Sequence, residues 1–247
     1  QLHLIPPVES RSYIDMTRAV QAAFGVHSRW LDATTLLLPG GQQYHPCDYN
    51  VEGDYSQAAF PAVLGAVCGG VTITGLAPDT LQGDAAILDI LRRCGAVFTR
   101  KGDSVTFAKA PLHGVDIDLA DCPDLGPVLM VLGLLCKGTT VIRNAERLRL
   151  KESDRLQSIC AGLNAIGGRA SETADGIVVE GTGGFAGGRV DSFGDHRIAM
   201  AFAVAATASE RPVTVCGAEC ASKSYETFFD EYERLGGRLS IEGSARA

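Results

Sequence analysis

The sequence contains no hydrophobic run long enough to cross a bilayer, for which about 18 apolar residues are needed. Its most apolar stretch, residues 128–136, is short and is closed by Lys137 and Gly138. Basic residues are not in excess either, since 22 Lys and Arg stand against 29 Asp and Glu and the net charge is -7. We therefore expect neither a membrane protein nor a nucleic-acid-binding protein, although a local group of cations would still suit a small anion.

Cysteine is present, but not at the spacing of a metal site. The eight cysteines are scattered, with no CxxC pair and no His and Cys cluster at zinc-site spacing. Several fall within apolar helical stretches, where a buried reduced thiol is the ordinary state. The sequence therefore predicts a cytoplasmic protein without a metal ion.

Two short charged strings, each at the start of a predicted apolar helix, are the most informative feature of the chain. Ser153 and Asp195 are the expected N-cap residues. Arg155 and Arg197 lie in the first turns, where the partial positive charge of a helix N-terminus disfavours a cation. Together with free backbone N–H groups they predict a site for a phosphate ester or a small carboxylate. The strings are KESDR at residues 151–155 and GDHR at residues 194–197.

The alternative is that both arginines lie on the surface and pair with neighbouring aspartates. A third cation in a similar place, Lys223 just before Tyr225, favours the anion site over this alternative.

The chain also repeats itself about every 70 residues, at positions 54, 124 and 195. Each of these aspartates precedes an apolar helix, a β-rich run, an amphipathic helix ended by glycine, and strand-like segments. The expected ranges are 56–68, 71–74, 84–94, 96–100 and 104–107 in the first copy, 125–136, 139–142, 154–166, 169–173 and 176–179 in the second, and 197–208, 213–216, 225–235 and 238–241 in the third.

This period predicts an α/β fold of three βαβαββ repeats packed around their first helices. Those helices are apolar nearly all round, which is typical of helices buried in a core. The third copy ends without a clear strand after Ile241, which leaves a sheet edge in need of a partner. We assign the three repeats to one domain at residues 47–247.

Residues 1–46 do not belong to the three repeats. Residues 12–24 predict a helix ended by Gly25, residues 34–38 predict a strand, and residues 40–46 are rich in turn formers. This segment is similar to the last half of a further repeat, and the chain begins with Gln1 rather than Met. We therefore expect a fragment of a longer protein, in which residues 1–46 are the tail of another domain plus a linker.

The motifs resemble those of the enolpyruvyl transferases, and within them the 5-enolpyruvylshikimate-3-phosphate synthase family. The resemblance implies two inside-out domains of three repeats each, with the active site between them. This chain would hold one domain and the tail of the other, so the first half or a complementing chain would be needed. The matching strings are SYIDMT at residues 12–17, VEGD at 51–54, RLKESDRL at 149–156, GDHRIAMA at 194–201 and KSY at 223–225.

The reaction that the resemblance implies is enolpyruvyl transfer from phosphoenolpyruvate to the 5-hydroxyl of shikimate 3-phosphate, with release of phosphate and without a cofactor. It belongs to the shikimate pathway of aromatic amino acid biosynthesis. The catalytic residues implied are Asp124, Glu152, His196 and Lys223. The substrate-binding residues implied are Ser10, Tyr13, Asp124, Lys151, Arg155, Arg197 and Lys223.

Two of these roles are specific. Asp124 would be the base for the attacking hydroxyl, unless it only caps a helix. Glu152 would transfer a proton at the phosphoenolpyruvate carbon, although neighbouring cations favour its ionised form. The family often has an asparagine or glutamate a few residues before the lysine-glutamate pair that matches residues 151 and 152. Here that stretch, residues 146–149, is ERLR, and we give Arg147 no role.

Two other functions stay open on the sequence alone. One is a related enolpyruvyl transferase that acts on a UDP-sugar. The other is a half-enzyme that binds anions without catalysis, because one domain supplies only one wall of a cleft.

Overall fold

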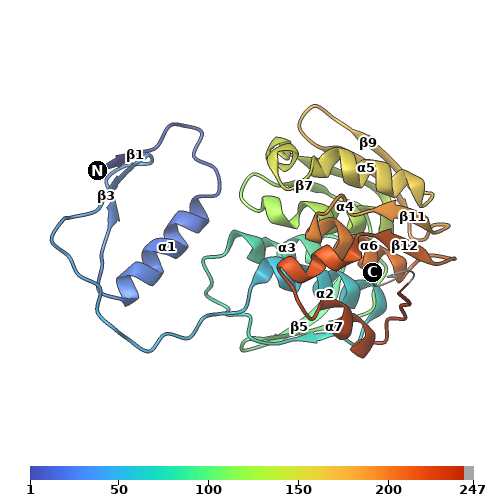
Figure 1. The fold of residues 1–247 in the computed structure, drawn as a ribbon, viewed down its shortest axis with the longest axis horizontal. Coiled ribbons are helices and arrows are strands. Elements are labelled where there is room, and N and C mark those ends of the chain that lie inside the picture. The colour runs from blue at the N-terminus through green and yellow to red at the C-terminus, as the bar shows by residue number, and fades with distance from the viewer. Residues whose placement is uncertain (242–247) are drawn as a thin grey trace, which may run out of the picture.

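The computed structural model describes residues 1–241, and its helices and sheets confirm the α/β class. A small N-terminal part lies to one side of a larger body, and an extended segment joins the two (Figure 1). In this part, helix α1 (Arg11–Ala23) lies beside an antiparallel sheet of strand order β1-β3-β2. Its strands are β1 (Leu2–His3), β2 (Arg29–Trp30) and β3 (Thr35–Leu37).

The middle repeat of the body shows the complete predicted order of elements. Its sheet has the strand order β7-β8-β10-β9, in which β7 and β8 are parallel and the other pairs are antiparallel. Its elements are β7 (Asp116–Asp118), the short helix η2 (Pro123–Leu125), α4 (Gly126–Leu135), β8 (Lys137–Arg143), η3 (Glu146–Leu150), α5 (Arg155–Ala165), β9 (Arg169–Glu172) and β10 (Ile177–Thr182).

The other two repeats each match a part of the middle one. The first has the order β4-β6-β5, equivalent to β8-β10-β9, and the third has the parallel pair β11-β12, equivalent to β7-β8. The first contains α2 (Tyr55–Cys68), β4 (Thr72–Ile73), η1 (Gly83–Ala85), α3 (Ala86–Arg93), β5 (Val97–Lys101) and β6 (Ser104–Ala108). The third contains β11 (Gly188–Asp191), α6 (His196–Ala206), β12 (Val213–Cys216), η4 (Ala218–Lys223) and α7 (Phe228–Arg234).

The prediction of a strand at residues 238–241 is wrong, because these residues have no regular structure. A strand needs a neighbour for its N–H and C=O groups, and within residues 1–241 the sheet of the third repeat consists of β11 and β12 alone. The first repeat likewise has no strand at residues 47–54. The full βαβαββ unit is therefore complete only in the middle repeat of the described chain.

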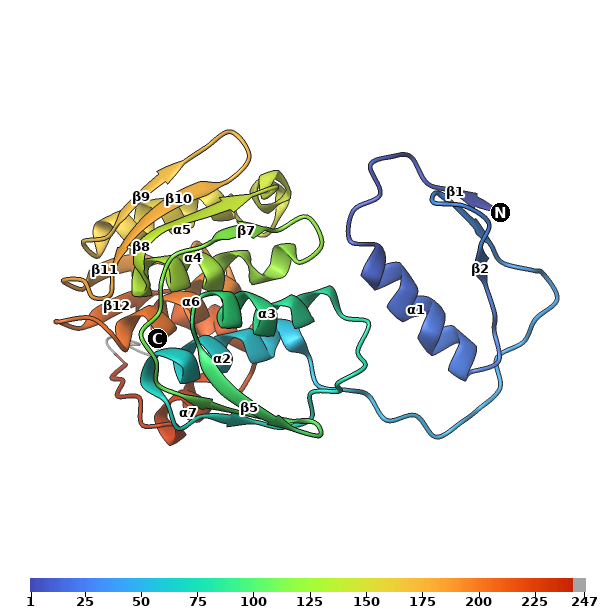
Figure 2. The ribbon, with the colours of Figure 1, turned by 180° about the vertical axis from the view of Figure 1, so that it is seen from behind.

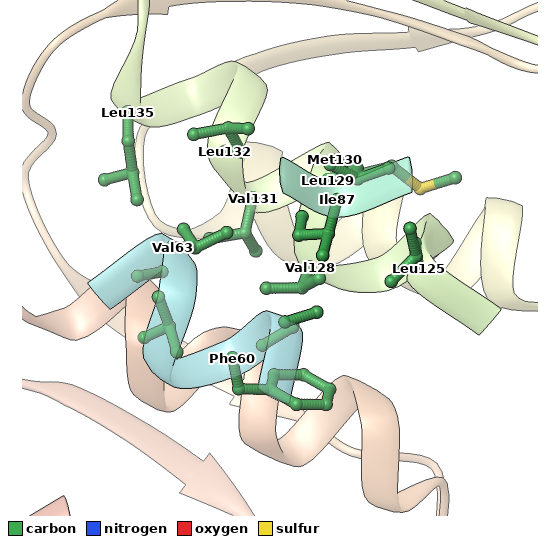
Figure 3. Packing of buried hydrophobic residues seen from close by; sticks show 14 of the residues in the cluster. Phe60, Val63, Ile87, Leu125, Val128, Leu129, Met130, Val131, Leu132 and Leu135 are labelled. Carbon is green, nitrogen blue, oxygen red and sulfur yellow. The ribbon is translucent and has the colours of Figure 1, made fainter. Parts of the chain in front are cut away.

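The first helices of the three repeats form the buried centre, as predicted. All ten residues of α4 are buried, and so are most residues of α2 and α6. Figure 3 shows Phe60 and Val63 of α2 facing Val128 and Val131 of α4, with Ile87 of α3 beside them. Figure 2 shows the strands on the outside of these helices. The starts of the inner helices are thereby held rigidly with respect to one another.

The contact between α5 and α6 depends on a glycine. A Cβ atom on Gly162 would collide with the ring of Phe202, which is fully buried. We expect Gly162→Ala to destabilise the protein by up to about 2 kcal/mol, because overpacking (about 1–3 kcal/mol) outweighs the gain in helix propensity (about 1 kcal/mol). Urea unfolding measures the loss. Gly184→Ala is the matched control, since a Cβ there meets only one atom at 3.7 Å, and equal stability of both variants would contradict the prediction.

Candidate active site

The N-terminal ends of the three inner helices meet at one place. Arg197, in the first turn of α6, donates from Nη2 to Ser56 Oγ of α2 (3.0 Å) and from Nη1 to the carbonyl oxygen of Asp124, just before α4 (3.3 Å). Each helix N-terminus carries partial positive charge and N–H groups without a helical partner. Helix N-termini that converge in this way favour a negative charge between them, and the anion site that the charged strings indicate stays a prediction.

Arg155 is the centre of the side-chain network in this region. Its side chain is 1% exposed, and it is bonded through Nε to Asp195 Oδ2 at 2.7 Å. Nη2 donates to Asp195 Oδ1 (3.2 Å) and to Glu152 Oε2 (2.7 Å), and Nη1 lies 3.4 Å from Asp124 Oδ1. Both arginines of the two strings therefore pair with carboxylates, but they do so inside the protein and not on its surface.

The N-cap prediction holds for one helix and is wrong for the other. Asp195 caps α6 by accepting from the N–H of Arg197 (3.0 Å). Helix α5 is capped by Asp154, which accepts from Gln157 N (3.0 Å), and not by Ser153. Ser153 Oγ instead donates to Asp195 Oδ2 (3.2 Å), because Asp154 already occupies the cap position and the neighbouring buried carboxylate needs donors.

Asp124 lies among three cations. Its carboxylate oxygens are 3.1 Å from Lys151 Nζ, 3.4 Å from Arg155 Nη1 and 3.4 Å from Arg197 Nη2. Burial alone raises the pKa of Asp124, but Arg197, Lys151 and Arg155 outweigh burial, so the pKa lies below its usual value. The side chain does not cap a helix, so the capping alternative is excluded. An ionised carboxylate here is able to accept a proton.

Glu152 links Arg155 to Lys223, whose Nζ lies 3.3 Å from Glu152 Oε1. Burial raises the pKa of Glu152, but a backbone hydrogen bond, Arg155 and Lys223 lower it below its usual value. The ionised form is therefore favoured, as the sequence predicted. Lys223 is the last residue of η4. It is the most exposed cation of the network, with 58% of its side chain accessible.

His196 is buried beside this network. Among the described residues its Nδ1 atom has no hydrogen-bond partner, and it lies 3.9 Å from Glu152 Oε1 and 4.0 Å from Asp195 Oδ1. Burial and the charge of Arg197 lower the pKa of His196 below 6.5 and outweigh the two carboxylates. The imidazole is therefore neutral at neutral pH.

This lowered pKa has a measurable consequence for stability. Between the folded-state pKa of His196 and its unfolded value of 6.5, the unfolded chain binds more protons, so stability falls as the pH falls through that window. We expect this contribution, at most about 1.4 kcal/mol per pH unit, to disappear in His196→Asn. Urea unfolding at several values between pH 5 and pH 8 measures it. His27→Asn, at an exposed imidazole, should keep the wild-type slope, and an equal slope in His196→Asn would disprove the effect.

Seven predicted site residues thus come together in one network, whereas Ser10 and Tyr13 lie at its border. Tyr13 donates to Asp84 Oδ2 (2.6 Å), and Ser10 Oγ accepts from Arg147 Nη1 (2.7 Å). Burial, and then the hydrogen bond to Asp84, raise the pKa of Tyr13. The seven residues of the network are Asp124, Lys151, Glu152, Arg155, His196, Arg197 and Lys223.

Sequence reasoning missed four members of the region. Asp195 was expected only as an N-cap, and Ser56, Asp84 and Arg147 were given no role. The repeat at positions 54, 124 and 195 was the available signal for Asp195. Ser56 lies two residues after the first of these positions, where its hydroxyl reaches Arg197.

Comparisons with known proteins identify the family of this chain. A model of the EPSP synthase (3-phosphoshikimate 1-carboxyvinyltransferase) family matches residues 2–232. The chain belongs to this family of transferases. The EPSP synthase family was also the one that the charged strings resemble, so that prediction is confirmed.

Curated relatives in the EPSP synthase family are longer than this chain. The 3-phosphoshikimate 1-carboxyvinyltransferase of Clostridium kluyveri is 41% identical over 97% of this chain and 56% of the relative. That of Methanocorpusculum labreanum is 40% identical over 98% of this chain and 57% of the relative. The chain therefore spans about half the length of the curated relatives it matches.

Solved structures show the same relation. EPSP synthase from Acinetobacter baumannii superposes with a TM-score of 0.81 at 29% identity and covers 92% of this chain and 55% of that one. The enolpyruvyl transferase NikO from Streptomyces tendae, at 21% identity and a TM-score of 0.75, shares the fold. Among residues 1–241, no helix has the length and apolar character to cross a membrane, and no three His, Cys, Asp or Glu side chains are grouped as a metal site requires.

Proposed function

We propose that this chain supplies one wall of an active site that transfers the enolpyruvyl group from phosphoenolpyruvate to the 5-hydroxyl of shikimate 3-phosphate. The observation that carries the proposal is the convergence of three helix N-termini on a network of four cations. Both substrates carry phosphate and carboxylate groups, which such a region binds. The four cations are Lys151, Arg155, Arg197 and Lys223.

The reaction is an addition followed by an elimination. The 5-hydroxyl forms a bond to C2 of phosphoenolpyruvate while C3 takes up a proton, and the tetrahedral adduct then loses phosphate and a proton to give the enolpyruvyl ether. Asp124 is the base for the hydroxyl, held ionised by its three cations. Glu152 exchanges the proton at C3, with His196 beside it. Arg197 and Lys223 hold phosphoenolpyruvate, and Lys151, Tyr13 and Ser10 hold shikimate 3-phosphate.

Arg155 contributes differently from the exposed cations in this proposal. Its guanidinium is occupied by Asp195, Glu152 and Asp124. A substrate anion reaches it only by displacing Glu152 or Asp124, which would free a carboxylate for proton transfer. Lys223 needs no such exchange, because most of its side chain is accessible.

The second wall comes from the part of the fold that the longer relatives contain and this chain does not match. Residues 1–46 are the tail of that other domain. Helix α1 has no buried residue, and a groove of about 400 Å³ beside it is lined by Leu2, Ile14, Leu36 and Leu38. Such an apolar face needs to be covered, and we assign that cover to the complementing half.

The free cysteine thiols of the chain are consistent with a protein of the cytoplasm, where thiols are kept reduced.

The test is phosphate release from shikimate 3-phosphate and phosphoenolpyruvate. We expect little or no turnover by the chain alone, because one wall can neither grip both substrates nor close over them. Adding the first half of the Clostridium kluyveri relative as a separate polypeptide should restore release. Arg197→Ala should abolish the restored activity, whereas Arg189→Ala, at an exposed position of β11, should retain it.

The outcomes separate the transferase from the non-catalytic half-enzyme. Full turnover by the chain alone would show that the second wall is not needed. Binding of substrate without turnover in the presence of the complementing half would make the chain a non-catalytic anion-binding protein. Neither binding nor turnover would reject the proposed function.

A further inference from the structure

Few polar contacts join the segment 1–46 to the body, and all of them lie near the start of α1. Tyr13 donates to Asp84 Oδ2 at 2.6 Å. Arg147 donates from Nη1 to Ser10 Oγ at 2.7 Å, and its Nε lies 3.4 Å from Glu9 Oε2. In the part of the chain from residue 1 to residue 241, these are the hydrogen bonds and ion pairs between the two parts. The placement of α1 therefore depends on very few groups.

Asp84 is the only buried carboxylate among these groups. It is 3% exposed, and its Oδ1 atom has no hydrogen-bond partner within the described chain. Its single partner is thus the hydroxyl of Tyr13, which comes from the other side of the boundary. A buried carboxyl without enough donors is costly, so the hydrogen bond from Tyr13 is the contact that offsets this cost.

The backbone around Asp84 is held firmly. Gln82 donates from Nε2 to the carbonyl oxygen of Gly53 (2.9 Å), and its Oε1 accepts from Tyr55 N (2.8 Å). This fixes η1 against the start of α2. At Gly83, an added Cβ would collide with the carbonyl oxygen of Asp121 and would lie 2.8 Å from Ser12 Oγ of α1. The close approach of α1 therefore requires glycine next to Asp84.

The Tyr13–Asp84 pair also lies beside the candidate active site. The charges of Asp124 and Arg197 act on both members of the pair. Burial raises the pKa of Asp84, and burial followed by the bond to Asp84 raises that of Tyr13. The Tyr13 hydroxyl therefore remains a neutral hydrogen-bond donor next to the base and one of the cations of the site.

We propose that Asp84 is a positioning residue, whose buried carboxyl fixes the hydroxyl of Tyr13 at the border of the site and, through Tyr13, holds α1 on the body. Its effect on substrate binding rests on the proposed function, whereas its effect on the placement of α1 does not. Arg147, through its contacts with Ser10 and Glu9, is the second link between the segment 1–46 and the body.

The first test is hydrogen exchange of the backbone amides of residues 10–17, followed by mass spectrometry. We expect Asp84→Ala and Tyr13→Phe to accelerate this exchange about tenfold, because each removes a charge-assisted hydrogen bond that holds α1. Asp84→Asn keeps an acceptor and should stay close to the wild type. Asp89→Ala, at an exposed carboxylate of the adjacent helix α3, is the matched control. Unchanged exchange in Asp84→Ala would overturn the proposal.

The second test is a double-mutant cycle on the dissociation constant for shikimate 3-phosphate, measured with the complementing half present. If Asp84 acts through Tyr13, then Asp84→Ala, Tyr13→Phe and the double variant should each weaken binding by the same factor, about tenfold. A product of the two single effects, about a hundredfold, would show that Asp84 acts independently and would overturn its positioning role. If the wild-type chain does not bind shikimate 3-phosphate even with the complementing half present, the proposed function fails, and the exchange experiment alone decides the role of Asp84 in holding α1.

Discussion

Replacing Arg155 with alanine should destabilise the protein by about 3–5 kcal/mol, because it leaves a buried carboxylate without its counter-ion. The side chains of Arg155 and Asp195 are 1% and 0% exposed, and two hydrogen bonds join them. After the substitution, the Asp195 side chain keeps, within residues 1–241, only its hydrogen bonds from Ser153 Oγ and from the N–H of Arg197. For a protein of this size the melting temperature should fall by roughly 6–20 °C.

Two further variants separate charge from packing in this prediction. Adding Asp195→Asn to Arg155→Ala removes the orphaned charge while the side chain can still cap α6, so the double variant should be more stable than Arg155→Ala. Lys223→Ala removes an exposed cation of the same network and should change stability by less than about 1 kcal/mol. Calorimetry provides the comparison. If Arg155→Ala has the same melting temperature as the wild type, the Arg155–Asp195 pair does not stabilise the fold.

Asp124→Asn should lower kcat in the complemented enzyme by about 10²–10⁴-fold, the usual contribution of a general base. The amide has nearly the same size, so packing is retained, but it cannot accept a proton from the attacking hydroxyl. The measurement is the initial rate of phosphate release at saturating substrates.

A binding experiment distinguishes loss of a base from damage to the site. Asp124 neutralises Lys151, Arg155 and Arg197, so removing its charge should leave the binding of inorganic phosphate unchanged or tighter. Calorimetric titration of the isolated chain measures this. Weaker phosphate binding together with a lower kcat would mean that Asp124 holds the cations in place and is not the base. Thr140→Val, at a buried hydroxyl of β8 away from the network, controls for general effects of a buried substitution.

The sequence alone determined the elements whose pattern is local. The inner helices were predicted within two residues at each end, because they are apolar all round, and the repeat of about 70 residues gave their number and order. The two charged strings also identified the family, and their prediction of an anion site is the basis of the proposed function. These features depend on residues that are neighbours along the chain, where capping, periodicity and composition act directly.

The tertiary structure decided which groups each charged side chain pairs with. No spacing in the sequence indicates that Arg155 reaches a carboxylate 40 residues away, or that Tyr13 bonds to Asp84 across the boundary of the segment 1–46. The failed strand at residues 238–241 has the same origin, since a strand forms only where another strand lies beside it. The Arg155–Asp195 pair arises because packing brings the starts of α5 and α6 together, and local sequence does not encode which elements pack against each other.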